Sequence, residues 1–127
     1  MTFLPVVPKL TEARFMAQLI SPSEHSPGLL RLLGFERIWH DRATNAPRAC
    51  PSCKAPLDLP RNDPGFPDLV AIRGSELWLV ELKSDRGKAT AEQLGWLRAL
   101  SAVTRVRFAI WRPRDIDRIV RQFRDRA

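Results

Sequence analysis

Residues 65–83 read GFPDLVAIRGSELWLVELK, in which two apolar runs are separated by a short polar turn. The runs cover residues 69–72 and 77–80, and each has the length of a β-strand. Gly74 and Ser75 lie between them, and glycine is a residue type that two-residue hairpin turns favour. The stretch therefore predicts an antiparallel β-hairpin with Gly74 and Ser75 at its tip.

The register of this hairpin brings two carboxylates together. Counting back from the tip along both strands places Asp68 opposite Glu81, and Lys83 shares their face because side chains alternate along a strand. Directly opposed residues have their β-carbons roughly 4.5–5.5 Å apart, so the two carboxylates repel each other. A shared proton, a cationic neighbour or a bound metal would offset that repulsion. Converging carboxylate oxygens suit Mg²⁺, and Lys83 adds a positive charge beside them.

The same face of the hairpin is expected to be the buried one. A sheet face that is apolar at successive positions normally packs against the core. The apolar residues on this face are Val70, Ile72, Leu77 and Leu79. The alternative is that Glu81 and Lys83 form a solvated cross-strand pair on the wet side of the hairpin.

Pro67-Asp68 followed at a distance by Glu81-Leu82-Lys83 resembles the signature of the PD-(D/E)xK nuclease superfamily. A longer set of segments is similar to its VRR-NUC branch, which includes small phage and bacterial nucleases that act on branched DNA. These segments are GFPDLV at 65–70, ELK at 81–83, KATAEQLGWL at 88–97 and WRP at 111–113. The resemblance is good from residue 65 to about residue 115, plausible over 11–40, and absent over 42–64.

The resemblance implies an α/β domain with a restriction-endonuclease-like core, in which helices flank a mixed central β-sheet. It also implies a Mg²⁺- or Mn²⁺-dependent endonuclease that hydrolyses phosphodiester bonds of branched or four-way DNA, and a homodimer. In that site Asp68, Glu81 and the backbone carbonyl of Leu82 hold the metal. Lys83 orients the attacking water, or helps to deprotonate it, and offsets charge on the phosphorane.

Two further polar residues are candidates for the same site. Thr90 and Gln93 have the spacing of a helix capping box, and Gln93 can reach the site from the first helical turn, as the family's glutamine does. The capping role is the alternative for Gln93, and both can hold. Glu12 falls within the apolar arc of a helix expected to start after Thr11, so it either reaches the metal through water or serves the helix dipole.

The charge of the chain favours nucleic acid as a partner. The 127 residues contain 21 Lys and Arg against 14 Asp and Glu, a net charge of +7, and they are expected to form one domain. A C-terminal helix is expected to begin near Ile116, with an arginine-rich surface. Either this surface tracks DNA phosphates or it is the solvated side of an amphipathic helix. The candidate DNA-binding residues are Arg112, Arg114, Arg118 and Arg121.

Residues 42–64 form a proline-rich insertion that contains Cys50 and Cys53. The CxxC pair is half of a zinc site, which His40 with another group, or a second chain, would have to complete; otherwise these are two free thiols. No apolar stretch approaches the ~20 residues that cross a bilayer, so a cytoplasmic protein with no membrane contact is expected. The alternatives to a nuclease are a catalytically silent DNA-binding or scaffold domain and a zinc-stabilised interaction module.

Overall fold

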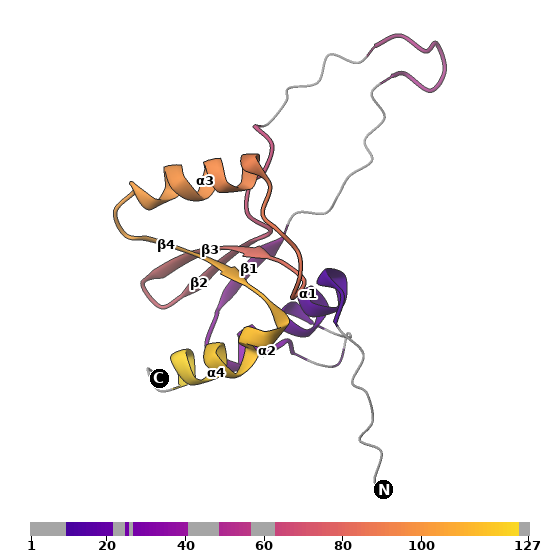
Figure 1. The fold of residues 1–127 in the computed structure, drawn as a ribbon. Coiled ribbons are helices and arrows are strands. Elements are labelled where there is room, and N and C mark those ends of the chain that lie inside the picture. Colours follow the sequence, from indigo (N-terminus) through magenta and orange to yellow (C-terminus); the bar gives the residue numbers. More distant parts are fainter. Residues whose placement is uncertain (1–9, 22–24, 26, 41–48, 57–62, 125–127) are drawn as a thin grey trace, which may run out of the picture.

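A mixed four-stranded β-sheet lies at the centre of the molecule, with helices on both of its faces (Figure 1). The computed structural model describes residues 10–21, 25, 27–40, 49–56 and 63–124. The sheet order is β1-β2-β3-β4, in which β1–β2 and β2–β3 are antiparallel and β3–β4 is parallel. The predicted α/β class with a mixed sheet is therefore confirmed. The strands are β1 (Arg37–His40), β2 (Leu69–Arg73), β3 (Glu76–Leu82) and β4 (Val106–Trp111).

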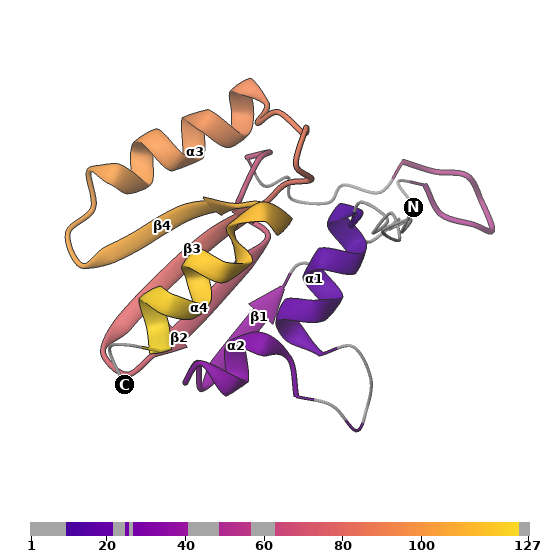
Figure 2. The same cartoon turned by 60° about the horizontal axis from the view of Figure 1, so that its bottom comes forward.

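The helices divide unequally between the two faces of the sheet (Figures 1 and 2). One face is covered by α3 (Ala91–Ser101) alone. The other face carries α1 (Glu12–Ile20), α2 (Leu29–Leu32) and α4 (Ile116–Arg124), and the short 3₁₀ helix η1 (Pro113–Asp115) leads into α4. In the described part of the chain, no helix has the length and apolar character needed to cross a bilayer.

The β2–β3 hairpin has the predicted register. Val70 pairs with Leu79 and Ile72 with Leu77, and Arg73 pairs with Glu76 around a two-residue turn. Gly74 has a φ of +58°, a left-handed conformation that glycine adopts without strain. The chain reversal thus follows from local chemistry.

The hydrophobic core lies on the face that α1, α2 and α4 cover. It gathers the inward side chains of β2 and β3 with residues of these helices, and four aromatic rings pack at its centre with centroids 5.0–6.1 Å apart. Rings at such distances gain from edge-to-face contact beyond the area they bury. The strand residues on this face are Leu69, Ala71, Trp78, Val80 and Leu82, and the rings are Phe35, Trp78, Trp111 and Phe123.

The main core lies on the opposite side of the sheet, so the prediction that the carboxylate face is the buried one is confirmed only in part, since Leu79, Glu81 and Lys83 there are 6%, 1% and 8% exposed. On that face Val70 and Leu77 are half-buried and Ile72 is 38% exposed, because α3 covers only part of it. All positions from 77 to 80 are apolar, so the alternation that normally distinguishes the two faces of a strand is missing. Three amphipathic helices pack on the opposite face and make it the main core.

The proline-rich insertion is described only over residues 49–56. There Ala49 and Pro56 form an isolated antiparallel bridge, and the Cys50 N–H donates a 2.8 Å hydrogen bond to the Ala55 carbonyl. The remainder of the segment predicted at 42–64, apart from 63 and 64, lies outside the described residues. The Cys50 and Cys53 thiols are therefore carried on a small hairpin.

Candidate active site

Asp68 and Glu81 meet on the face of the sheet that α3 covers. Leu69 pairs with Val80, so the next residues outward in the register are Asp68 and Glu81. Asp68 Oδ2 accepts a 2.8 Å hydrogen bond from the backbone N–H of Leu82, which fixes this carboxylate across the end of β3. The predicted pairing of the two acids is confirmed.

Glu81 is a buried carboxylate with three polar neighbours. Glu81 is 1% exposed, and its Oε1 accepts a 2.6 Å hydrogen bond from Gln93 Nε2. Lys83 Nζ lies 3.5 Å from the same oxygen. Burial raises the pKa of Glu81 to about 7, and the charge of Asp68 and a hydrogen bond with it act in the same direction, while Lys83 opposes them. The pair therefore tends to retain a proton near neutral pH.

The donor set at this point fits a divalent cation. Two carboxylates converge there. The Lys83 ammonium compensates their charge only in part, so the pKa of Glu81 stays raised. A cation beside the pair would favour the ionised forms, and Mg²⁺ prefers hard carboxylate and carbonyl oxygens. Asp68 and Glu81, with the neighbouring backbone carbonyl of Leu82, are therefore residues that could hold one.

The side-chain amide of Gln93 makes two hydrogen bonds, one to the backbone at the start of α3 and one to Glu81. Its Oε1 accepts from the Thr90 backbone N–H at 2.8 Å, and Thr90 Oγ1 accepts from the Gln93 backbone N–H at 3.2 Å. This reciprocal capping box starts α3. With the amide oxygen used in the cap, the amide nitrogen is directed at Glu81, so the helix start and the site are fixed by the same residue. The sequence allowed both contacts, and both are present.

The loop before Asp68 packs tightly on the first turns of α3. Gly65 has a φ of +94°, and a Cβ there would lie 2.5 Å from the Glu92 carbonyl carbon. Trp96 donates from Nε1 to the Asp63 carbonyl at 3.3 Å and packs edge-to-face on Phe66, with centroids 5.0 Å apart. The sequence analysis missed this positioning role, for which glycine just before the Phe-Pro-Asp segment was the available signal.

Arg112 holds the segment that follows Lys83. Its Nη1 donates to the Ser84 carbonyl at 2.7 Å and also to the Gly87 carbonyl. Asp115 Oδ2 accepts from the Arg112 backbone N–H at 2.8 Å, so the clamp is itself anchored at the start of η1. Arg112 was predicted as a DNA contact, but its half-buried guanidinium is engaged within the protein. It is better described as a positioning residue.

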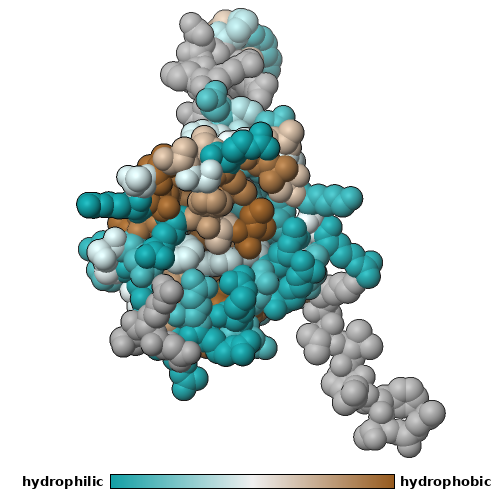
Figure 3. All heavy atoms as spheres, turned by 60° about the vertical axis from the view of Figure 1, so that its left-hand side comes forward, coloured by the Kyte–Doolittle hydropathy of each residue, from teal (hydrophilic) through white to brown (hydrophobic). Residues whose placement is uncertain are grey.

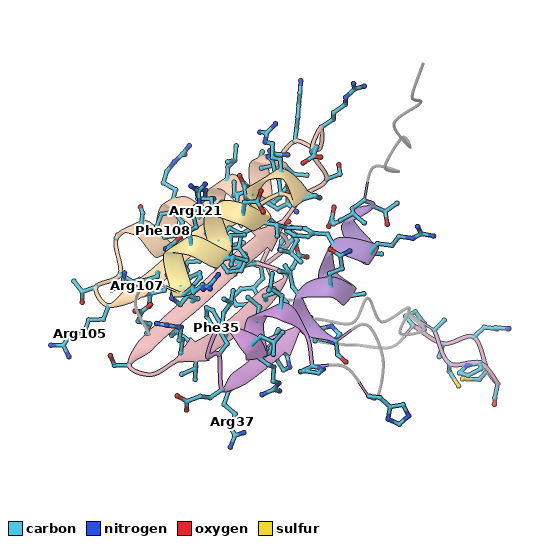
Figure 4. The ribbon with its side chains drawn as sticks, turned by 90° about the horizontal axis from the view of Figure 1, so that it is seen from below. Phe35, Arg37, Arg105, Arg107, Phe108 and Arg121 are labelled. Atoms are coloured by element: carbon cyan, nitrogen blue, oxygen red, sulfur yellow. The ribbon has the colours of Figure 1, made fainter. Side chains whose placement is uncertain are left out.

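Of the other predicted arginines, Arg121 lies across the sheet from the carboxylates. Arg114, Arg118 and Arg121 are exposed, and Arg118 Nη2 lies 3.7 Å from Asp115 Oδ1. Figure 4 views the molecule from the side of α1, α2 and α4, and there Arg121 lies on α4, across the sheet from α3. The structure therefore does not bring Arg121 together with Asp68 and Glu81.

Glu12, the possible water-mediated metal ligand, is the first residue of α1. It is exposed in the first turn of α1, whose N-cap Thr11 accepts a 3.2 Å hydrogen bond from the Arg14 N–H. An acidic residue in this position interacts favourably with the helix dipole, which was the alternative interpretation. An exposed carboxylate also avoids the desolvation that an inward orientation would impose.

Cys50 and Cys53 are free thiols on the 49–56 hairpin. Hydrogen bonds from the Cys53 backbone, then from its side chain and the Ser52 backbone, lower the pKa of Cys50. Within the described ranges, no group of three or more His, Cys, Asp and Glu side chains is placed to hold a metal ion. A zinc ion at Cys50 and Cys53 would therefore need ligands from beyond these ranges or from another chain.

Comparisons of the chain with protein-family models, with curated proteins and with solved structures give no match. The chemistry of the site is therefore what indicates its function.

Proposed function

We propose that the protein is a Mg²⁺-dependent DNA endonuclease with a restriction-endonuclease-like core, which hydrolyses phosphodiester bonds. One observation carries the proposal: Asp68 and the buried Glu81 are in contact beside Lys83, and Gln93 donates to Glu81. Buried like charges are unfavourable for folding, so a site that retains them is a candidate functional site. The resemblance of the same residues to the PD-(D/E)xK signature supports the assignment.

The metal would be held by Asp68, Glu81 and the Leu82 backbone carbonyl. When bound, Mg²⁺ or Mn²⁺ supplies Lewis-acid stabilisation of phosphate charge and lowers the pKa of a coordinated water. Glu81 gives up its shared proton when a cation approaches, because the positive charge favours the carboxylate. Gln93 keeps Glu81 Oε1 in place through the 2.6 Å hydrogen bond, which limits the reorganisation that binding requires.

Lys83 is the residue assigned to the reacting water and phosphate. Lys83 is only 8% exposed, and its ammonium lies 3.5 Å from Glu81 Oε1. From there it can donate to the attacking water or to a phosphate oxygen, and it offsets negative charge that grows in the transition state. Glu12 is not assigned a role, because it is exposed in the first turn of α1.

The test is cleavage of DNA by Asp68→Asn. This variant should lose Mg²⁺-dependent cleavage while its DNA affinity is kept or raised, because one negative charge near the phosphate is removed. Lys83→Ala should likewise lower the cleavage rate. Asp117→Asn is the matched control, since Asp117 is exposed on α4, and it should cleave normally. Cleavage by Asp68→Asn at the wild-type rate, under chelator-controlled Mg²⁺, would exclude the proposal.

DNA contacts outside the site are assigned to Arg114, Arg118 and Arg121, which are exposed. Arg112 is left out of this set because its half-buried guanidinium donates through Nη1 to the Ser84 and Gly87 carbonyls. Replacing an arginine that binds one phosphate of duplex DNA should reduce the magnitude of the salt slope by about 0.9. Binding of all sequences should weaken alike, since phosphate contacts carry no sequence information.

The substrate we propose is branched DNA, cut by a homodimer. The described part of one chain carries one such carboxylate pair, whereas symmetric cutting of a four-way junction needs two sites in one assembly. Light scattering at micromolar concentration should give the mass of two chains. The mass of one chain, with junction cleavage intact, would exclude the dimer.

A catalytically silent DNA-binding domain is the second candidate. The 3.5 Å approach of Lys83 Nζ to Glu81 Oε1 favours it, because an internal ammonium partly balances the buried acid without a metal. The same Asp68→Asn experiment separates the two candidates: a silent domain binds DNA but has no cleavage for the substitution to remove.

A further inference from the structure

Strand register arranges the α3 side of the sheet in rows that run across the strands. Asp68 and Glu81 begin the row at one end. The next row contains one residue from each strand, and the row after it begins with Arg37 on β1. Adjacent rows are about 7 Å apart, which is two residues of β-strand rise. The second row is Trp39, Val70, Leu79 and Phe108, and the third is Arg37, Ile72, Leu77 and Val106.

α3 covers these rows at Leu79 on β3 and leaves the β1–β2 part open, while Phe108 on β4 is 39% exposed. Leu79 is 6% exposed and Leu97, on α3, is 7% exposed. In contrast, Trp39 is 54% exposed and Ile72 is 38% exposed. Figure 3 shows apolar side chains that reach the surface and are surrounded by hydrophilic ones. The open part of the face therefore presents a large aromatic ring to solvent, one row from the carboxylates.

A shallow groove of about 280 Å³ follows this open edge. Its residues combine two arginines with apolar side chains, and no acidic residue is among those described as lining it. Arg31 Nη1 donates to the Glu36 carbonyl at 2.7 Å, which orients its guanidinium, and Arg37 extends from the edge of the sheet (Figure 4). The lining residues are Arg31, Arg37, Ile38, Trp39, Val70 and Ile72.

We infer that this groove binds a single-stranded segment of nucleic acid next to the carboxylate pair. Trp39 stacks on an unpaired base, and Arg37 and Arg31 contact its phosphates. Cationic side chains beside an exposed indole match a polyanion that carries planar bases. A base within a duplex has its faces covered by its neighbours, so stacking on Trp39 selects unpaired nucleotides. The inference rests on the proposed nuclease function only in linking this strand to the cleavage site.

A second copy of the chain is the less suitable occupant. Each chain has a net charge of +7, and two copies of this groove would oppose arginine to arginine. Like charges at close range are unfavourable. A polyanion neutralises the same arginines, so charge complementarity favours nucleic acid.

The experiment measures binding of a labelled single-stranded oligodeoxynucleotide, and of the matching blunt duplex, in the presence of chelator. Trp39→Ala should weaken single-strand binding by about 5- to 160-fold, which is the range for removing the stacking of one base. Duplex binding should change much less. Trp39→Phe should retain most of the affinity, and Arg37→Gln should reduce the magnitude of the single-strand salt slope by about 0.7.

Two variants serve as matched controls. Leu32→Ala removes an apolar side chain that is 70% exposed on α2, and Arg14→Gln removes an exposed arginine on α1. Neither residue lines the groove, and both variants should bind as the wild type does. Intrinsic fluorescence gives a second readout, because Trp39 is 54% exposed, whereas Trp78 and Trp111 are buried and Trp96 is half-buried. Quenching by the single strand should be reduced in Trp39→Phe.

Three outcomes would overturn the inference. Trp39→Ala could bind the single strand as tightly as the wild type, or it could lose affinity for single strand and duplex equally. It could also convert a two-chain particle to one chain without nucleic acid, which would make the groove an interface between copies. Cleavage with Mg²⁺ is assayed separately. Trp39-dependent binding without cleavage would overturn only the nuclease proposal. Cleavage without Trp39-dependent binding would overturn only the proposal that the groove binds a single strand.

Discussion

The two faces of the β-sheet are built from the same strands but serve different purposes. Strand β3 directs Trp78, Val80 and Leu82 into a core closed by three helices, while Glu81 points to the face that α3 alone covers. On the first face aromatic rings exclude water. On the second face a buried acid is held by Gln93 and Lys83 beside exposed apolar side chains. Alternation along one strand thus separates the stabilising residues from the reactive ones.

This division has a physical consequence for stability. Burying apolar side chains contributes favourably in proportion to area, whereas confining two carboxylates opposes folding. The core face must therefore stabilise a site that is itself unfavourable. Substitutions on the two faces should differ in size, and for the acids also in sign.

The largest difference in the free energy of unfolding should come from replacing a phenylalanine by alanine on each face. Phe123 is 1% exposed in the core and contacts three other rings, so Phe123→Ala should lower the free energy of unfolding by about 3–5 kcal/mol. Phe108 is 39% exposed on the α3 side, so Phe108→Ala should lower it by about 1 kcal/mol or less. Denaturant unfolding measures both. Equal losses would mean that both faces are sealed from water.

An increase in stability is expected for Glu81→Gln, measured in chelator. The pKa of Glu81 is raised from its ordinary 4.5 to about 7, so the unfolded chain loses this proton at lower pH than the folded chain does. Wild-type stability should therefore fall as pH rises from about 4.5 to about 7 and then level off. Because glutamine does not titrate, the variant should be more stable above that window by up to about 3 kcal/mol.

The comparison for Glu81 is made by urea unfolding at pH 4 and pH 8. Glu92→Gln is the matched control, because Glu92 is exposed in the first turn of α3, where its charge interacts favourably with the helix dipole, so the substitution should not stabilise the protein at pH 8. Parallel pH profiles for the wild type and Glu81→Gln would show that the carboxylate pair retains no proton.

A smaller and more local effect is expected for Arg112→Ala. Removing its charged hydrogen bonds to Ser84 and Gly87 should cost about 1.5–3 kcal/mol and free the segment after Lys83. Amide hydrogen exchange should accelerate over residues 84–88 but not in β3, and cleavage should slow while DNA affinity is unchanged. Arg112→Lys should restore part of the cleavage rate.

Arg114→Ala is the matched control for the hydrogen-exchange measurement only, because Arg114 is a proposed DNA contact, and exchange over residues 84–88 should stay as in the wild type. The Arg114 contact with Asp85 uses the backbone N–H, at 3.0 Å, so the substitution leaves that hydrogen bond in place. If Arg112→Ala weakened DNA binding and left exchange unchanged, Arg112 would be a DNA contact and not a clamp.

Local periodicity and turn chemistry were sufficient for much of the molecule. A two-residue turn at Gly74 sets the β2–β3 register, and that register alone brings Asp68 opposite Glu81. The spacing of Thr90 and Gln93 predicted the cap that starts α3. These features follow from residues close in sequence, for which the geometry of one strand or one helical turn suffices.

The remaining features depend on contacts between residues far apart in the chain. Which face of β3 became the core was decided by the packing of α1, α2 and α4, since the strand itself is apolar on both faces. The partners of Arg112 lie 28 and 25 residues away. Trp39 lies beside Val70 only because β1 pairs with β2. The residue pattern within one helix or strand does not encode such pairings. The tertiary structure decides them, because all the helices and strands bury their apolar side chains together in one core.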